Sequence, residues 1–331
     1  MKSKLTFYEG KAVLVTGGAG FIGSHLVEKL LELNCEVSVA DNLSRGSLEN
    51  ISHLLKRIHF HKVDLTKMEN ALSVTRGVDY VFHLAADVGG IHYIRKENVG
   101  CLTPDLLMHV NMLEACRINN VKRFLFTSSA CVYREKNPAG LNIFEELDAI
   151  PANPLTTYGW AKLIGEILCR SYYLDYGVGC SVVRIFNAYG ERENLDPKWS
   201  HVVPSLIRKA ILYPTEGFRI FGDGRQERAF LYVKDCVEGL VLALMKIDDA
   251  QPVNLGSNEV ISIEELAKKI IAISGKEIKI EYDFSGPRGT NKYCADTTKM
   301  RKVLGWEPKT PLDVGIRKTY EWAKSKLVGS D

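Results

Sequence analysis

The sequence lacks several patterns that mark whole classes of protein. Its eight cysteines include no CxxC pair, so we expect no zinc centre and assign no metal ligands. No apolar run approaches the roughly 20 residues that a membrane-spanning helix needs. The formal net charge is only +3, and the charged residues are spread along the chain. This distribution does not favour nucleic acid as a partner.

The chain also shows no internal repeat, no low-complexity tract and no obvious linker. Its first nine residues are polar, so we expect no secretion signal and a cytoplasmic protein with reduced thiols. What is present is ordinary for a globular protein, with 331 residues, 46% hydrophobic and 25% charged. This length suits two lobes or one large α/β unit.

A glycine-rich turn near the N-terminus is the first functional pattern. The apolar run 11–16 predicts a buried strand, and residues 22–33 show the apolar spacing of a helix. Gly17, Gly20 and Gly23 stand between them, where glycines permit a tight turn and close approach of the backbone to a pyrophosphate. Because the helix then begins with unpaired amides, this context predicts a dinucleotide site.

Acidic residues at the ends of the next two predicted strands refine the cofactor. Asp41 follows strand 36–40 and can accept hydrogen bonds from an adenosine ribose, while it would repel the 2′-phosphate of NADP. Arg45 could soften that repulsion, and Asp41 could be a solvated loop acid, but the pattern favours NAD. We expect the cofactor to contact Gly17, Gly20, Phe21, Ile22, Gly23, Asp41, Asn42, Asp64, Leu65, Ala85, Tyr158 and Lys162.

The alternation of predicted elements indicates the fold. Strands at 58–63, 79–86, 123–127 and 180–186 alternate with helical patterns at 104–119 and 158–175. This order predicts an α/β fold with a Rossmann-type, doubly wound parallel sheet. We place the NAD-binding domain at 1–187, with segments near 235–257 as candidates to return to it. Residues 188–331 are then a smaller α+β substrate-binding lobe.

A phenol, an amine and a hydroxyl carry the expected redox chemistry. Tyr158 and Lys162 are four residues apart and share one face of a helix. The ammonium should lower the pKa of the phenol towards neutrality, which makes it a base for oxidising an alcohol. Ser129 can hydrogen-bond the same substrate oxygen. A Tyr–Lys pair alone is more often a coincidence on a helix, but the glycine turn and Ser128-Ser129 reverse that judgement.

This combination resembles the extended short-chain dehydrogenase/reductase family, which contains NAD-dependent nucleotide-sugar epimerases and dehydratases. The resemblance implies that the N-terminal lobe holds NAD(P) and the C-terminal lobe a nucleoside-diphosphate sugar. It also implies a homodimer built on helices 104–119 and 158–175. The matching positions are residues 16–23, 64–65, 83–86 and 128–133, Tyr158 with Lys162, Asn187, Arg228 with Asp235, and 304–308.

Cys131 narrows the expectation within the family. Simple 4-epimerases usually have threonine or another small residue there, and dehydratases an Asp-Glu pair. A thiol with a histidine or lysine in the second lobe resembles GDP-mannose 3,5-epimerases and GDP-fucose synthases, which pass through a 4-keto sugar. A C4 ketone acidifies the protons on C3 and C5, so two residues can exchange them.

His201 is the expected partner of Cys131. A histidine here matches the GDP-fucose synthases, whereas the 3,5-epimerases have lysine, and Lys198 is a spare candidate. Cys131 could instead be a packing residue, and His201 a helix cap or a phosphate contact.

The resemblance also implies a set of substrate contacts, of which each arginine could instead be a surface charge. These are Gly89, Gly90, Asn187, His201, Arg228 and Arg288.

We therefore expect an NAD-dependent nucleotide-sugar epimerase with C3/C5 proton exchange, acting on a GDP-sugar or, less favoured, a UDP-sugar. The alternatives are a UDP-sugar 4-epimerase in which Cys131 is a spectator and an NADPH-dependent 4-keto-sugar reductase of the GDP-fucose synthase type. A non-catalytic NAD-binding regulator is a further alternative, which the intact Ser129, Tyr158 and Lys162 oppose. The base, the sugar, the inverted carbon and the oligomeric state are left open.

Overall fold

A seven-stranded parallel sheet forms the centre of the molecule, in the strand order β12-β7-β5-β4-β1-β2-β3. The computed structural model describes residues 6–90, 93, 98–134, 141–285 and 292–329. The sheet confirms the predicted fold class. Its strands are β1 (Ala12–Thr16), β2 (Glu36–Asp41), β3 (Ile58–Lys62), β4 (Tyr80–His83), β5 (Arg123–Ser129), β7 (Cys180–Ile185) and β12 (Asp249–Leu255).

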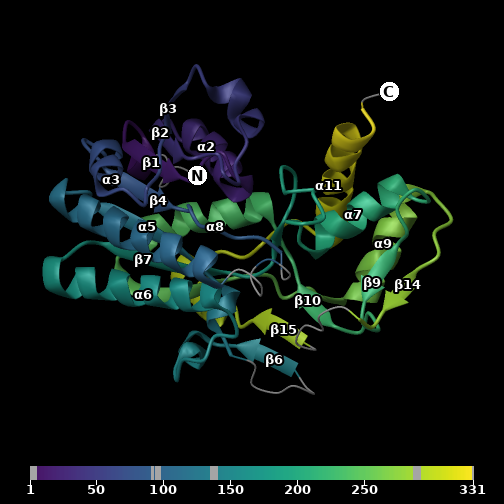
Figure 1. Cartoon of the computed structure of the whole chain (residues 1–331). Helices are drawn as coiled ribbons and strands as arrows, with labels where there is room; N and C mark the ends of the chain where they lie inside the picture. Colours follow the sequence, from purple (N-terminus) through teal and green to yellow (C-terminus); the bar gives the residue numbers. More distant parts are fainter. Residues whose placement is uncertain (1–5, 91–92, 94–97, 135–140, 286–291, 330–331) are drawn as a thin grey trace.

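Helices cover both faces of this sheet (Figure 1). Because side chains alternate along a strand, Val13 and Val15 of β1 face one layer and Leu14 the other. The first layer contains α2 (Phe21–Glu32), α8 (Val233–Lys246) and α10 (Thr298–Leu304). The second contains α3 (Met68–Val74), α5 (Asn98–Ile118) and α6 (Thr157–Tyr176). No helix in the described ranges is both long and apolar enough to cross a membrane.

A smaller lobe lies beside the sheet and has its own apolar core (Figure 1). Ile207, Leu266 and Ile316 bring its three helices together. The chain passes more than once between this small lobe and the large lobe, which is the seven-stranded sheet with its helices. Helix α8 and strand β12 follow the first strands of the small lobe in the sequence but belong to the large lobe. The lobe's helices are α7 (Val202–Leu212), α9 (Ile263–Ser274) and α11 (Leu312–Leu327).

Short strands complete the small lobe and its junction with the sheet. They form a four-stranded sheet in the order β13-β10-β15-β6 and the pairs β11–β8 and β14–β9. Their bounds are β6 (Leu141–Phe144), β8 (Ala188–Tyr189), β9 (Arg219–Phe221), β10 (Glu227–Ala229), β11 (Leu231–Tyr232), β13 (Val260–Ser262), β14 (Glu281–Asp283) and β15 (Lys292–Ala295). Three 3-10 segments are η1 (Leu48–Leu54), η2 (Ala130–Val132) and η3 (Glu146–Ala149).

Two boundaries differ from the sequence-based expectation. The strand predicted at 79–86 ends at His83, because the amides of Leu84 and Ala85 donate to Oγ1 of Thr16 at 3.2 and 3.1 Å. The helix predicted to start at Pro104 already begins at Asn98. Proline removes one backbone donor, and here the helix continues through it. Both differences lie near the carboxyl end of β4.

Candidate active site

One cleft of about 1930 Å³ runs along the carboxyl ends of the strands and into the small lobe. Ligands of open α/β sheets bind at this edge. Two of the predicted site residues are not among those that line this cleft. The amide of Gly90 donates to the carbonyl of Trp199 at 3.0 Å, outside the lining, and Arg288 lies outside the described residues. The predicted residues that line the cleft are Gly17, Gly20, Phe21, Ile22, Gly23, Asp41, Asn42, Asp64, Leu65, Ala85, Gly89, Ser129, Cys131, Tyr158, Lys162, Asn187, His201 and Arg228.

The glycine turn forms a cradle that fits a dinucleotide. Gly17 has a φ of +68°, and a Cβ on Gly23 would lie 2.2 Å from the carbonyl oxygen of Gly17. Helix α2 then starts at Gly20 with no side-chain cap. Its first amides and the positive end of its dipole therefore face the cleft, as a pyrophosphate requires.

Asp41 is held in place at the end of β2 rather than solvated. Its Oδ2 accepts a hydrogen bond from Ala19 at 3.0 Å and its Oδ1 one from Leu43 at 2.8 Å. Burial raises the pKa of this carboxyl, and the two amides partly offset the rise. The guanidinium of Arg45 binds Asp87, with its Nη2 at 2.7 Å from Oδ1. The positive charge that could have softened repulsion of a 2′-phosphate is thus paired elsewhere.

The structure brings the expected redox group together. Helix α6 begins after Thr156, whose Oγ1 accepts the amide of Gly159 at 3.1 Å. It places Tyr158 and Lys162 in the cleft wall, 8% and 2% exposed. Nζ of Lys162 lies 5.7 Å from the ring centroid of Tyr158. Ser129 ends β5, and its hydroxyl accepts the amide of Cys131 at 3.1 Å, which starts η2.

Burial dominates the pKa of Tyr158 in the cofactor-free protein, so the predicted effect of Lys162 beside a nicotinamide stays a prediction. Burial raises the pKa of the Tyr158 phenol well above its ordinary value, and Cys131 and Asp105 add to the rise. A hydrogen bond from Ser129 acts in the opposite direction. Burial also lowers the pKa of Lys162, against the attraction of Asp105. Because loss of water has the largest effect, the phenol of Tyr158 is protonated in the cofactor-free protein.

A buried ion pair supports the site from behind. Glu166 on α6 receives Nε and Nη2 of Arg184 at 2.8 and 2.6 Å, and both side chains are less than a tenth exposed. Oγ of Ser128 donates to the same carboxylate at 2.5 Å. This network joins β5, β7 and α6, and so fixes the spacing of Ser129 and Tyr158.

Cys131 differs from the other cysteines. It is partly exposed on the cleft wall, whereas the other seven are buried. Burial of its sulfur raises the pKa of the thiol, while the Ser129 hydrogen bond and the charge of Lys162 act to lower it. Cys131 is therefore a thiol in the free protein, with two neighbours that favour its ionisation.

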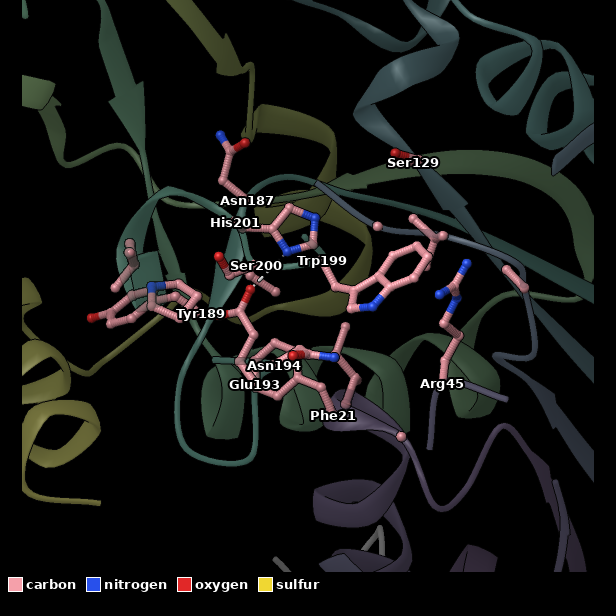
Figure 2. Close-up of a pocket in the computed structure, with 18 of the residues that line it drawn as sticks. Phe21, Arg45, Ser129, Asn187, Tyr189, Glu193, Asn194, Trp199, Ser200 and His201 are labelled. Atoms are coloured by element: carbon pink, nitrogen blue, oxygen red, sulfur yellow. Dashed lines mark hydrogen bonds and ion pairs between the residues drawn. The ribbon is translucent and has the colours of Figure 1, made fainter. Parts of the chain in front are cut away.

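His201 is paired with an acid that the sequence analysis did not identify. Its Nδ1 lies 2.7 Å from Oε1 of Glu193, an interaction visible in Figure 2. Glu193 is 4% exposed, whereas the His201 side chain is 54% exposed. His201 precedes α7 but makes no side-chain cap. Partial loss of water in the cleft lowers the pKa of His201, but the hydrogen bond and charge of Glu193 raise it above its ordinary value.

Three other predicted residues have defined positions. Asn187 has a φ of +42° and donates from Nδ2 to the carbonyl of Ala229 at 3.0 Å. Arg228 lies above the Tyr293 ring, with 5.8 Å between guanidinium carbon and centroid. Lys198, the spare acid, is exposed and outside the cleft lining, with Nζ 4.5 Å from the Trp199 ring centroid.

These features define a class of protein. A parallel sheet with a glycine cradle after β1 and a Ser–Tyr–Lys group beside β5 is that of a dinucleotide-binding enzyme of the short-chain dehydrogenase/reductase type. A family model described as the NAD-dependent epimerase/dehydratase family matches residues 13–256. The chain belongs to this family.

Known proteins similar to this chain carry several related activities. GDP-mannose 3,5-epimerase 1 of Oryza sativa subsp. japonica is 39% identical over 316 residues, covering 95% of this chain and 82% of its own. GDP-L-fucose synthase of Sinorhizobium fredii is 33% identical, covering 95% of each. The structure of Thermus thermophilus UDP-glucose 4-epimerase in complex with NAD is 29% identical, with a TM-score of 0.84 over 96% of this chain and 100% of its own. The matches confirm the predicted family, fold and NAD cofactor, and support the class of nucleotide-sugar epimerase.

Proposed function

We propose that this protein is a nucleotide-sugar epimerase that exchanges protons at C3, C5 or both through a transient 4-keto sugar. One observation carries the proposal. The thiol of Cys131 lies on the large lobe and the imidazole of His201 on the small lobe. Both line the cleft that also contains Ser129, Tyr158 and Lys162. A 4-epimerase that only moves hydride has no need of this second pair.

The first step oxidises the sugar at C4. Bound NAD supplies the hydride acceptor. Tyr158 takes the hydroxyl proton, and Ser129 hydrogen-bonds the same oxygen. Because burial raises the pKa of Tyr158, its loss of a proton depends on the Ser129 hydrogen bond and on the nearby Lys162 ammonium.

The second step uses the acidity of the carbons beside the ketone. One residue removes a proton and the other returns one to the opposite face, after which the hydride returns to C4 and Tyr158 gives the proton back to the C4 oxygen. His201 keeps its proton to higher pH because Glu193 pairs with it, which suits the donor. Cys131 suits the acceptor once ionised, and the Ser129 hydrogen bond and Lys162 charge favour that ionisation.

A GDP-sugar is the proposed substrate. The 39% identity to a GDP-mannose 3,5-epimerase supports the guanine nucleotide. Gly89, Asn187 and Arg228 line the cleft where a diphosphate and sugar would extend into the small lobe. Gly90 and Arg288 stay proposed contacts from the family resemblance.

We also propose a homodimer in the cytoplasm. Helices α5 and α6 lie side by side on one face of the large core (Figure 1). Between them they expose large apolar side chains, which is typical of a surface covered by a partner. These are Val99, Leu107, Val110, Ile118, Trp160, Ile167, Leu174 and Tyr176.

The experiment is isotope exchange in deuterated water. The NAD-loaded enzyme is incubated with GDP-mannose, with other GDP-sugars and with UDP-glucose, and deuterium is located by NMR. We expect deuterium at C3 or C5 of a GDP-sugar, and none with Cys131→Ala. If no substrate gains deuterium at either carbon, the Cys131–His201 role is wrong. Full turnover of UDP-glucose by Cys131→Ala would favour the 4-epimerase alternative. Oxidation of added NADPH in the presence of a GDP-4-keto sugar would favour the reductase.

A further inference from the structure

Arg45 joins parts of the cleft that are far apart in the sequence. It follows β2 in the large core, and its Nε and Nη2 lie 3.0 and 2.7 Å from Oδ1 of Asp87. Its guanidinium carbon is 3.5 Å from the ring centroid of Trp199, in the segment before α7. Figure 2 shows the guanidinium beside the indole. One side chain of the loop after β2 thus contacts both the loop after β4 and the segment that carries His201.

Asp87, the carboxylate partner of Arg45, is itself held by two further hydrogen bonds. The amide of Asp87 donates to Oδ1 of the buried Asp105 at 2.7 Å. The hydroxyl of Tyr93 donates to Oδ2 of Asp87 at 2.8 Å, and the Tyr93 ring lies 4.5 Å from the Arg45 guanidinium. Arg45 is therefore held between two aromatic rings and a carboxylate, which leaves it little freedom to follow a moving loop.

The backbones of the two loops also meet. The amide of Gly90 donates to the carbonyl of Trp199 at 3.0 Å. A Cβ on Gly90 would lie only 2.5 Å from the carbonyl oxygen of Ser200. Glycine is thus required for this close approach. The Arg45 side chain therefore strengthens a contact between the Gly90 loop and the Trp199 segment that their backbones already make.

The segment between β8 and α7 is attached to the large core at a second place. Nη2 of Arg192 binds Oε1 of Glu28 on α2 at 2.5 Å, and Nε2 of His25 lies 3.0 Å from the carbonyl of Glu191. Glu193, the partner of His201, lies between this attachment and the one at Trp199. A displacement at either end would shift the acid–imidazole pair relative to the redox group.

We propose that Arg45 is a positioning residue that ties the His201 segment to the large core and so sets His201 against the sugar carbon next to the ketone. This rests on the proposed function. Arg45 acts through Trp199 and touches neither exchanging proton. Its loss should therefore impair proton exchange more than C4 oxidation, because Arg45 contacts Asp87, Tyr93 and Trp199, whereas the redox group is carried by β5 and α6 and supported by the Glu166–Arg184 pair.

The test separates the two steps in the variant Arg45→Met, which keeps the apolar stem and removes the charge. C4 oxidation is followed by the absorbance of reduced nicotinamide in single turnovers, and C3/C5 exchange by deuterium incorporation. We expect the ratio of exchange to oxidation to fall by about tenfold or more, since a displacement of about 1 Å has effects of this order. Arg45→Lys keeps the charge without the paired hydrogen bonds, so it should restore part of the ratio.

A second readout needs no turnover. Hydrogen–deuterium exchange of backbone amides should become faster at Gly90, Trp199 and Ser200 in Arg45→Met, with and without NAD. The matched control is Arg225→Met, the same change at an arginine whose side chain is 87% exposed. It should alter neither readout. Trp199→Phe, which keeps a smaller ring, provides an intermediate variant if Arg45→Met does not fold.

Several outcomes are decisive. An unchanged ratio of exchange to oxidation in Arg45→Met, or an equal loss of both steps with weaker NAD binding, would overturn the positioning role. If the wild-type enzyme itself incorporates no deuterium at C3 or C5, the proposed function is wrong. The hydrogen–deuterium exchange measurement still tests whether Arg45 holds the His201 segment. Unchanged protection of the backbone amides in Arg45→Met would show that it does not.

Discussion

His201 faces the cleft while its Nδ1 lies 2.7 Å from the buried carboxylate of Glu193. The two residues come from one segment of the small lobe, but only Glu193 is withdrawn from solvent. With Nδ1 donating to a carboxylate, the ring presents Nε2 to a ligand. Glu193 therefore orients the imidazole and favours its charged form.

Substitution Glu193→Gln should move the alkaline limb of the pH–activity profile to lower pH. Glu193 raises the pKa of His201, so a proton donor at this position is lost as the pH rises through that raised value. Without the carboxylate, the loss comes earlier. The measurement is kcat/KM against pH, with Glu264→Gln, at a partly exposed acid outside the cleft lining, as the control. An unshifted limb would argue against His201 as the donor.

Asp105 should make the protein less stable above its folded-state pKa. Burial raises the pKa of this carboxyl from 3.8 to about 6, against the attraction of Lys162. The folded state then binds more protons between these values, so stability falls as the pH rises through this window. Asp105→Asn keeps the acceptor for the Asp87 amide. Denaturant unfolding should show it up to about 3 kcal/mol more stable at pH 7 and unchanged near pH 3; equal stability at pH 7 would contradict this.

Breaking the buried ion pair should destabilise the fold strongly. Glu166→Gln leaves the guanidinium of Arg184 without its carboxylate, where its side chain is only 3% exposed. We expect a loss of about 3–5 kcal/mol in denaturant unfolding. The pair of Lys268 with the partly exposed Glu264 is the comparison, and Glu264→Gln should change stability little. Similar effects from both substitutions would mean that the buried pair is not special.

Asp41 should set the preference for NAD over NADP. Its carboxylate is fixed by two backbone amides, and the nearby Arg45 is paired with Asp87. Asp41→Ala removes the negative charge that opposes a 2′-phosphate. The ratio of the Kd values for the two cofactors should shift towards NADP by about tenfold, the effect of one close charge. Titration of the cofactor-free protein measures it, and an unchanged ratio would mean that Asp41 does not read the ribose.

The exposed apolar face of α5 and α6 should be a dimer interface. Leu107 and Ile167 are 46% and 55% exposed, and replacing both with glutamate would place charges in a buried contact. Sedimentation should show a dimer for the wild-type chain and a monomer for the double variant. Val314→Glu on α11, where the side chain is 44% exposed, is the matched control. If the wild-type chain sediments as a monomer, the proposed dimer interface is wrong.

The parts of the site that depend on local patterns could be predicted from the sequence. The glycine turn, Ser129, and Tyr158 with Lys162 lie at strand ends or on one helix face, where spacing alone determines proximity. The raised pKa of Tyr158 in the cofactor-free protein could not be predicted, because spacing shows the neighbouring ammonium but not the loss of water. The contact between Arg45 and Trp199 depends on how two distant loops meet, and no spacing encodes it. Glu193 was visible only as an acid in a polar turn.

The exposure of a single cysteine has a practical consequence. Because the other seven thiols are buried, a maleimide added to the native protein should attach at one position, Cys131. The number of labels per chain then counts functional clefts, and protection by a bound nucleotide sugar reports occupancy without any turnover. The raised pKa of this thiol implies that labelling accelerates with pH, so its rate would measure the ionisation on which the proposed proton exchange depends.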